Sequence, residues 1–462
     1  MTTDTTASTT DMIFKGSKEY DEARSTASWN ARLPDRYPHV IAPAKDAADV
    51  IAAVRYARDR GLKVKARSGG HSWTASGIRD GSVMVDLSLM NNIRYVPGEM
   101  TAVVEPGVHG HELNTLLAPH NLFFPTGHCS TVALGGFLLQ GGWGWNSRSV
   151  GPACLSVEAV DVVTADGELI RADKDHNPDF WWAARGAGPG YFGIVTAFHV
   201  RLHNRPKVMR ESSYVYPLAL RTEVLRWAHE VGPTMPTELE FSLLATTPRQ
   251  ADGEIDEAGT ALVVFGRALM ADEEAARAAL DILDTCPVLD QAVRSATHVP
   301  TTFEELYAQQ DGVEEKGFRW CADNVWTDAG IEELLPSVED MFVTVPTAVS
   351  HVLWYQWHPQ EFPDAAISIQ GNLYIAAYSG WTDSSQDEQM AAWPRDHMAR
   401  LDPLSNGTAL ADENLVERPA RFLSEENERR LEGLRSRHDP EGLFLSYLTV
   451  SDVEADTAAA TS

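Results

Sequence analysis

Positively charged side chains are scarce in this sequence. Only 38 lysines and arginines stand against 66 aspartates and glutamates, which gives a formal net charge of −28. Such a chain repels nucleic acids and anionic membrane surfaces, so neither is expected as a partner. No apolar run approaches the length that spans a bilayer. Residues 1–12 are rich in threonine and lack the basic start and apolar core of a secretory signal, which predicts a disordered lead and a cytoplasmic location.

Cysteine is also scarce, with four residues in a chain of 462. Their number and wide spacing exclude a disulfide framework and favour a reducing compartment. The length allows two domains, and a 44% share of hydrophobic residues is enough to fill their cores. The four are Cys129, Cys154, Cys286 and Cys321.

Short apolar runs alternate with helical patterns in the first 200 residues, which predicts a layered α/β or α+β domain, and the resemblance described below favours α+β. A helix is expected over Asp46–Arg60, ended by Gly61, and another begins within Gly107–Leu117. After a break at Arg201–Pro206 the pattern indicates a second domain. Strands are expected at Val83–Leu87, Thr101–Glu105, Val157–Thr164, Gly193–Leu202, Thr260–Phe265, His351–Gln356 and Ile367–Leu373, further helices at Asp272–Leu283 and Ser424–Arg437, and disorder over 451–462.

The most informative stretch is Lys63–Trp73, KVKARSGGHSW. Its first residues resemble a strand that runs into two adjacent glycines, where successive backbone N–H groups can surround an anion such as phosphate. The turn places the imidazole of His71 beside that anion. An ordinary glycine turn with a surface histidine explains this stretch equally well, because a lone glycine-rich loop is weak evidence.

A second glycine-rich stretch follows at Phe124–Ser147, FPTGHCSTVALGGFLLQGGWGWNS. Closely spaced glycines with apolar residues between them suit a backbone packed tightly against a large flat ligand. Cys129 lies within this stretch, two residues after Gly127.

Taken in order, these motifs resemble the berberine-bridge-enzyme-like branch of the vanillyl-alcohol-oxidase flavoproteins. The resemblance covers nearly the whole chain and is strongest over 40–202. The matching motifs are Arg67-Ser68-Gly69-Gly70-His71, Gly127-His128-Cys129, Gly141-Gly142-Trp143-Gly144, Val162–Gly167, Phe180–Gly186, Phe192–Thr196 and Asp439-Pro440.

The resemblance implies FAD attached twice, through His71 at the 8α methyl and through Cys129 at ring carbon 6. Cys129 could instead be a small buried hydrophobe, as free cysteines often are. The resemblance also implies that Val132, three residues after Cys129, permits reaction with O2. No metal is expected. The residues implied to surround the cofactor are Arg67, Ser68, Gly69, Gly70, Ser72, Gly127, Val132, Gly135, Gly136, Gly141, Gly142, Gly144, Ile194 and Val195.

The sequence leaves several candidates for the catalytic base, because the Tyr-x-Asn-Tyr motif common in the family is replaced by residues 409–415. Asp412 or Glu413 could substitute for the missing tyrosine, although acidic residues usually lie on solvated loops. Tyr447 occupies a position where many relatives carry asparagine, so it could act beside the flavin or simply pack. Tyr374 is a further candidate, because its spacing from Tyr378 would place both on one face of a strand, although a position in the hydrophobic core explains it at least as well.

The resemblance therefore implies a two-domain fold of the PCMH type. Residues 1–205 and 415–462 would bind FAD, and 206–414 would bind a small-molecule substrate on an antiparallel sheet covered by helices. The expected activity is hydride removal from an alcohol, either a carbohydrate or a hydroxylated secondary metabolite, or from an amine, with O2 reduced to H2O2. An oxidative cyclisation or oxygenation in secondary metabolism and a non-catalytic flavin-binding protein are the alternatives. A nicotinamide dehydrogenase is disfavoured, because no G-x-G-x-x-G opens a helix after a strand.

Overall fold

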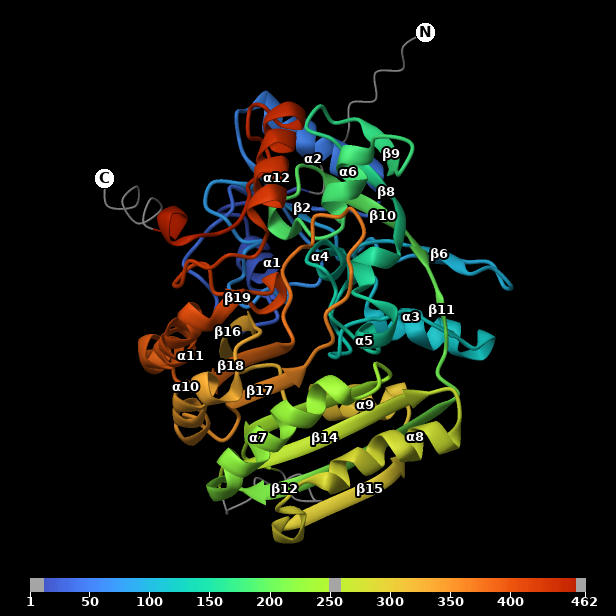
Figure 1. The fold of residues 1–462 in the computed structure, drawn as a ribbon. Coiled ribbons are helices and arrows are strands. Elements are labelled where there is room, and N and C mark those ends of the chain that lie inside the picture. The colour runs from blue at the N-terminus through green and yellow to red at the C-terminus, as the bar shows by residue number, and fades with distance from the viewer. Residues whose placement is uncertain (1–11, 249–258, 454–462) are drawn as a thin grey trace.

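The computed structural model describes residues 12–248 and 259–453, and shows an α+β fold in which an N-terminal part lies above a large antiparallel sheet (Figure 1). Two stretches that were expected to be disordered lie outside the described residues. They are the lead, apart from Met12, and residues 454–462 of the tail. Residues 450–453 form a helical turn, so the prediction of disorder from 451 was wrong there. In this turn Thr449 donates its backbone N–H to the Asp452 carboxylate.

A four-stranded sheet and a five-stranded sheet form the N-terminal part. In the first, β2, β4 and β3 are parallel and β1 pairs antiparallel with β2. The second is antiparallel throughout. In spatial order the strands are β1 (Ile13–Phe14), β2 (Val40–Pro43), β4 (Val83–Asp86) and β3 (Val64–Arg67), then β5 (Ile93–Tyr95), β6 (Thr101–Val104), β10 (Ile194–Arg201), β8 (Val157–Val163) and β9 (Leu169–Asp173).

Helices α1 to α6 lie in the same part of the chain as these sheets. The first long one begins where predicted, because the Asp46 carboxylate caps it by accepting the N–H groups of Ala48 and Asp49. A two-stranded ribbon, β7 (Leu122–Phe123) with β11 (His203–Asn204), lies beside them. The helices are α1 (Tyr20–Thr26), α2 (Ala47–Asp59), α3 (Gly110–Leu117), α4 (Leu134–Leu139), α5 (Ser147–Val150) and α6 (Pro178–Ala184).

The large sheet has eight antiparallel strands. Four helices share a hydrophobic core with one face of it: α7 (Arg221–Val231), α8 (Glu273–Leu280), α10 (Ile331–Val343) and α11 (Asp387–Leu401). The predicted antiparallel sheet covered by helices is confirmed. Helix α9 (Phe303–Asp311) lies apart from these four and packs with residues of the N-terminal part. The strands in spatial order are β15 (Arg294–Pro300), β12 (Val208–Pro217), β14 (Ala261–Met270), β13 (Leu239–Thr246), β17 (His351–Gln356), β18 (Leu373–Trp381), β16 (Arg319–Thr327) and β19 (Ser405–Gly407).

The strand expected at Ile367–Leu373 was wrong, because β18 begins only at Leu373. The residues before it cross to the N-terminal part, where the Ile367 N–H donates to the carbonyl of Arg185. Ile367 is buried there beside Cys154. An apolar run is buried in either arrangement, so the sequence pattern could not distinguish a strand from this crossing loop.

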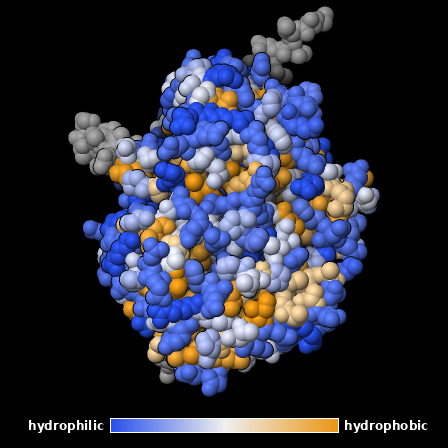
Figure 2. Space-filling view, in the orientation of Figure 1, coloured by the Kyte–Doolittle hydropathy of each residue, from blue (hydrophilic) through white to orange (hydrophobic). Residues whose placement is uncertain are grey.

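The chain returns to the N-terminal part at its C-terminal end. Helix α12 (Glu425–His438) packs on the hydrophobic core of the five-stranded sheet through Leu431 and Leu434. Phe444 then pairs with Val64 of β3 as a parallel bridge. Hydrophilic side chains cover most of the face shown in Figure 2, with small apolar areas scattered between them. Among the described residues no helix is both long and apolar enough to cross a membrane.

A buried ion pair ties the chain after β19 to the large sheet. The Arg418 guanidinium donates to both carboxylate oxygens of Asp323 at 2.7 and 2.6 Å, and to Asp402 at 2.6 Å. We expect Arg418→Met to lower the free energy of unfolding by about 3–5 kcal/mol, because the fully buried Asp323 carboxylate loses its partner. Chemical denaturation would measure this loss. The exposed Arg429→Met is the control, and an unchanged midpoint for Arg418→Met would contradict the expectation.

Candidate active site

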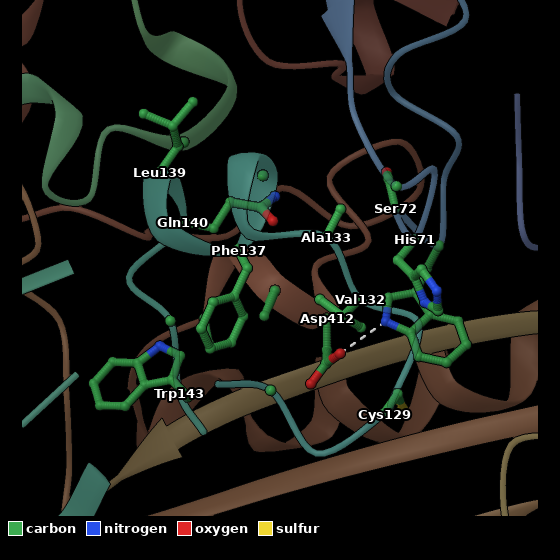
Figure 3. Close-up of a pocket in the computed structure, with 18 of the residues that line it drawn as sticks. His71, Ser72, Cys129, Val132, Ala133, Phe137, Leu139, Gln140, Trp143 and Asp412 are labelled. Carbon is green, nitrogen blue, oxygen red and sulfur yellow. Dashed lines mark hydrogen bonds between the residues drawn. The ribbon is translucent and has the colours of Figure 1, made fainter. Parts of the chain in front are cut away.

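A cavity of about 380 Å³ lies between the N-terminal part and the face of the large sheet that the helices leave uncovered. Alternation along the strands sets its lining. In β18, Tyr374 and Tyr378 face the cavity while Ile375 and Ala377 enter the helix-covered core. In Figure 3 His71, Ser72 and Cys129 lie at one end in this view, Phe137 and Trp143 at the other, and Asp412 between them.

His71 follows β3 in a loop that requires its glycines. Gly70 has φ of +75°, and a Cβ there would lie 2.4 Å from the Ala27 carbonyl oxygen. The Trp29 ring stacks on the imidazole with centroids 5.1 Å apart. Nε2 of His71 lies 2.9 Å from Oγ1 of Thr131, within the loop that carries Cys129. The two predicted anchors therefore reach one cavity from loops that contact each other.

Burial, with smaller contributions from His109 and Arg67, lowers the pKa of His71 to about 4. The imidazole is therefore neutral at physiological pH and keeps a lone pair on one ring nitrogen. Cys129 is half-buried, and its thiol donates to Oε2 of Glu314 at 3.2 Å. Burial and the neighbouring Glu314 carboxylate raise the pKa of Cys129 well above its usual value.

The residues expected to surround the cofactor divide into two groups. Gly135 and Gly141 do not line the cavity: a Cβ on Gly135 would lie 2.6 Å from Oγ of Ser68, and one on Gly141 would lie 3.0 Å from Ile367. Val195 is core, also outside the lining. The roles predicted for these three residues as cofactor contacts stay predictions. The residues that do line the cavity are Arg67, Ser68, Gly69, Gly70, His71, Ser72, Gly127, Cys129, Val132, Gly136, Gly142, Gly144 and Ile194.

Glycine serves close packing as much as ligand contact in this site. A Cβ on Gly144 would lie 2.1 Å from the Thr126 carbonyl oxygen, so the two loops can pass each other only without that side chain. A Cβ on Gly136, by contrast, would meet nothing within 4 Å. The Arg67 guanidinium is bound to Asp86 at 2.7 Å, which leaves its backbone as the part available to a ligand. One wall of the cavity is therefore backbone with few side chains, and the neutral imidazole of His71 lies in it. A large flat cofactor fits such a wall.

Asp412 is the centre of a hydrogen-bond cluster that the sequence did not reveal. Its Oδ1 accepts from Nε1 of Trp73 at 2.7 Å, drawn as the dashed line in Figure 3. Its Oδ2 accepts from the hydroxyls of Tyr374 at 2.5 Å and Tyr378 at 2.9 Å. The loop before it is fixed by Asn324, whose side chain pairs with the backbone of Ala409. The alternative of a solvated loop is therefore wrong for Asp412.

Burial, followed by the charge of Asp412, raises the pKa of Tyr374 and of Tyr378 well above the usual tyrosine value. Both phenols therefore stay protonated and act as donors. Tyr447 does not line the cavity. Its hydroxyl donates to the Ala187 carbonyl at 2.7 Å and its ring packs on Phe422, which matches the alternative of a packing role.

Sequence reasoning assigned no role to Trp73 or Glu314. Trp73 lies two residues after His71, so its nearness to the site was readable from the motif. Glu314 follows α9 in a segment without a recognisable motif, and only the fold brings it to Cys129. Among the described residues no group of three His, Cys, Asp or Glu side chains is arranged to hold a metal ion.

Glu413, next to Asp412, is also buried rather than solvated, and it does not line the cavity. Burial, with the nearby Asp323 carboxylate, raises its pKa to about 8. The folded state therefore holds this proton more tightly than the unfolded chain, and the stabilisation is lost as pH rises through about 8. We expect the melting temperature of Glu413→Gln, measured relative to the unsubstituted protein, to increase between pH 6 and pH 9. An equal pH dependence for both proteins would contradict this.

The chain is similar to known flavoproteins over most of its length. The profile described as "FAD binding domain" matches residues 38–173. The FAD-linked oxidoreductase ptmO of Penicillium ochrochloron is 32% identical over 431 residues, which covers 93% of this chain and 94% of that protein. This chain belongs to the FAD-linked oxidoreductases.

Solved structures show that this oxidoreductase has the fold of berberine-bridge-enzyme-like, PCMH-type flavoproteins. The 6-hydroxy-D-nicotine oxidase of Arthrobacter nicotinovorans matches with a TM-score of 0.82 and 23% identity, over 94% of this chain and 96% of that one. BBE-like 1 of Physcomitrella patens matches with 0.79 and 20%, over 95% and 97%. The grass pollen allergen Phl p 4 matches with 0.77 and 18%, over 95% and 96%.

Proposed function

We propose that this oxidoreductase is an oxidase that holds FAD covalently through His71 and Cys129 and removes hydride from a CH–OH group of a small molecule. The observation that carries the proposal is the arrangement of the cavity. Both candidate anchors line it, and the Asp412 cluster lines it as well. The bound flavin would accept the hydride and O2 would reoxidise it, giving H2O2.

Asp412 is the proton acceptor in this proposal. Three donors hold its carboxylate in a fixed orientation, and the protonated Tyr374 and Tyr378 cannot themselves accept a proton from the substrate. A substrate hydroxyl placed beside Asp412 would lose its proton to the carboxylate as the carbon gives up hydride. The tyrosines then act as positioning residues, which refines the catalytic role expected for Tyr374.

The substrate region of the cavity favours a largely apolar molecule. Its lining from the large sheet is mainly aromatic and aliphatic, with Trp326 and Trp357 packed edge to face at 6.0 Å and Trp143 against both. Flat apolar walls with a few polar groups are typical of sites for hydroxylated ring systems. An oxidative cyclisation of such a compound is the alternative, and the structure of the product would distinguish it from simple oxidation.

Val132 supports the oxidase assignment. It lines the cavity next to the Cys129 loop, and its side chain is compact. Wild-type Phl p 4 is described as a glucose dehydrogenase, whereas its variant with one isoleucine replaced by valine is described as a glucose oxidase. A small valine near the flavin is therefore proposed to leave space for O2.

We further propose that residues 1–205 and 415–462 together form the flavin domain, and that 206–414 form the substrate domain. The bridge between Val64 and Phe444 supports this division. So does Lys65, whose Nζ donates to the carbonyls of Leu445 and Ser446 at 2.9 Å each.

Acid precipitation of the purified protein tests the proposal. We expect a yellow pellet, with flavin mass on the His71 peptide and on the Cys129 peptide, and peroxide release with hydroxylated apolar substrates. Flavin that stays in the supernatant would overturn covalent attachment. A flavin that no substrate bleaches anaerobically, over a broad screen of hydroxylated compounds, would favour a non-catalytic flavin-binding protein.

A further inference from the structure

The Cys129 thiol has one hydrogen-bond partner of unusual character. Glu314 reaches it from the loop between α9 and β16, with Sγ 3.2 Å from Oε2. The Glu314 side chain is only 10% exposed and lines the same cavity. Within the described residues its carboxylate meets no lysine or arginine, and its nearest basic group is Nε2 of His351 at 3.9 Å.

This environment works against spontaneous ionisation of the thiol. Thiolates form readily beside cations or at helix N-termini, and Cys129 has acidic neighbours instead, Glu314 and Asp311. Sulfur is nucleophilic only as the thiolate. A bond from Cys129 to a flavin carbon therefore requires a base that takes the thiol proton at that moment.

Glu314 has the properties of such a base. Burial, with the Asp412 and Asp311 carboxylates, raises its pKa to about 7, while the hydrogen bond from Cys129 opposes that shift. A base with a pKa close to the working pH combines a populated basic form with useful proton affinity. The other nearby groups are unsuitable. Asp311 is bound to the N–H and hydroxyl of Ser130, and burial lowers the pKa of His351 to about 4.

We propose that Glu314 is the base that removes the Cys129 proton when the sulfur bonds to the flavin ring. The inference rests on the proposed function, since it requires FAD in the cavity and a second covalent link. As the S–C6 bond forms, the thiol proton passes to Glu314, the C6 hydrogen leaves as a proton, and the electron pair stays on the ring. O2 then takes two electrons and two protons to give H2O2, which restores the oxidised ring.

The test compares purified full-length variants by mass spectrometry of their flavin peptides. In Glu314→Gln we expect flavin on the His71 peptide as in the unsubstituted protein, and at least about tenfold less on the Cys129 peptide at pH 7. Asp311→Asn, which removes a nearby carboxylate that does not contact the thiol, is the matched control and should keep both links. Glu314→Gln with a complete second link would overturn the proposal.

Rescue by pH separates a base from a merely structural residue. Glu314→Gln carrying flavin on His71 alone is incubated in air at increasing pH, and the second link should form as the thiol ionises unaided. Absence of rescue at pH 10 would indicate that Glu314 only shapes the loop, and would overturn the proposal.

Should Glu314→Gln not retain flavin on His71, Glu314→Asp is the second variant. It should form the Cys129 link more slowly than the unsubstituted protein, and an equal rate would count against the base.

The outcome for the unsubstituted protein separates the two proposals. Flavin on His71 alone would defeat the second link of the proposed function, and the role of Glu314 with it. Two links in both the unsubstituted protein and Glu314→Gln would leave the proposed function intact and defeat only the role of Glu314.

Discussion

Asp412→Asn is expected to slow the reduction of the flavin by substrate by a factor of roughly 100 to 10,000. The amide has the size of the carboxylate and keeps one acceptor oxygen, which can serve either Trp73 or the two tyrosines, but it cannot take the substrate proton. Anaerobic stopped-flow measurement of flavin bleaching isolates this step from the reaction with O2.

Two further variants give this prediction its controls. Glu413→Gln changes the adjacent buried carboxyl, which does not line the cavity, and should reduce its flavin at the unsubstituted rate at pH 7. Tyr374→Phe removes one donor to Asp412 and should cause a smaller loss than Asp412→Asn. If Asp412→Asn reduced its flavin as fast as Glu413→Gln, Asp412 would not be the base.

Val132→Leu is expected to slow reoxidation of the reduced flavin by O2 at least tenfold, about 1.4 kcal/mol in the activation free energy. Val132 lies in the cavity wall beside the Cys129 loop, and an added methylene there would occupy the space that O2 needs. Mixing the reduced protein with aerated buffer and following the return of flavin absorbance measures this rate.

The two half-reactions provide the control for Val132→Leu. Flavin reduction by substrate should keep its rate, and turnover with an artificial electron acceptor should persist, so that the oxidase behaves as a dehydrogenase. A parallel loss in both half-reactions would indicate that leucine disturbs flavin binding rather than O2 access.

Much of the glycine-rich wall of the cavity was predictable from local sequence. The Gly-Gly-His turn and the Gly-His-Cys loop are contiguous motifs whose backbone conformation depends on residues within a few positions, such as Gly70 with its positive φ. Strand β4 and helix α2 were predicted almost to the residue, since buried runs and an Asp N-cap are local signals. The glycines were harder to interpret. Gly135 and Gly141 avoid clashes with other segments rather than lining the cavity.

The opposite wall was not predictable in the same way. Asp412 meets Trp73 across 339 residues and Tyr374 across 38, and Glu314 meets Cys129 across 185. An isolated acidic residue has the same local sequence whether it is solvated or buried, so its role depends on which segments the fold brings beside it. Tyr447 is the opposite case. Its position in the chain suggested a place beside the flavin, but in the structure its hydroxyl donates to a backbone carbonyl outside the cavity.

The sequence by itself determined the family, the α+β class and the two candidate anchors, because several glycine-rich motifs in a fixed order carry their own backbone requirements. Only the tertiary structure decided which carboxylates face the cavity and what they contact. Proton transfer depends on distances of about 3 Å between side chains from separate segments, and those distances exist only once the large sheet has packed against the N-terminal part.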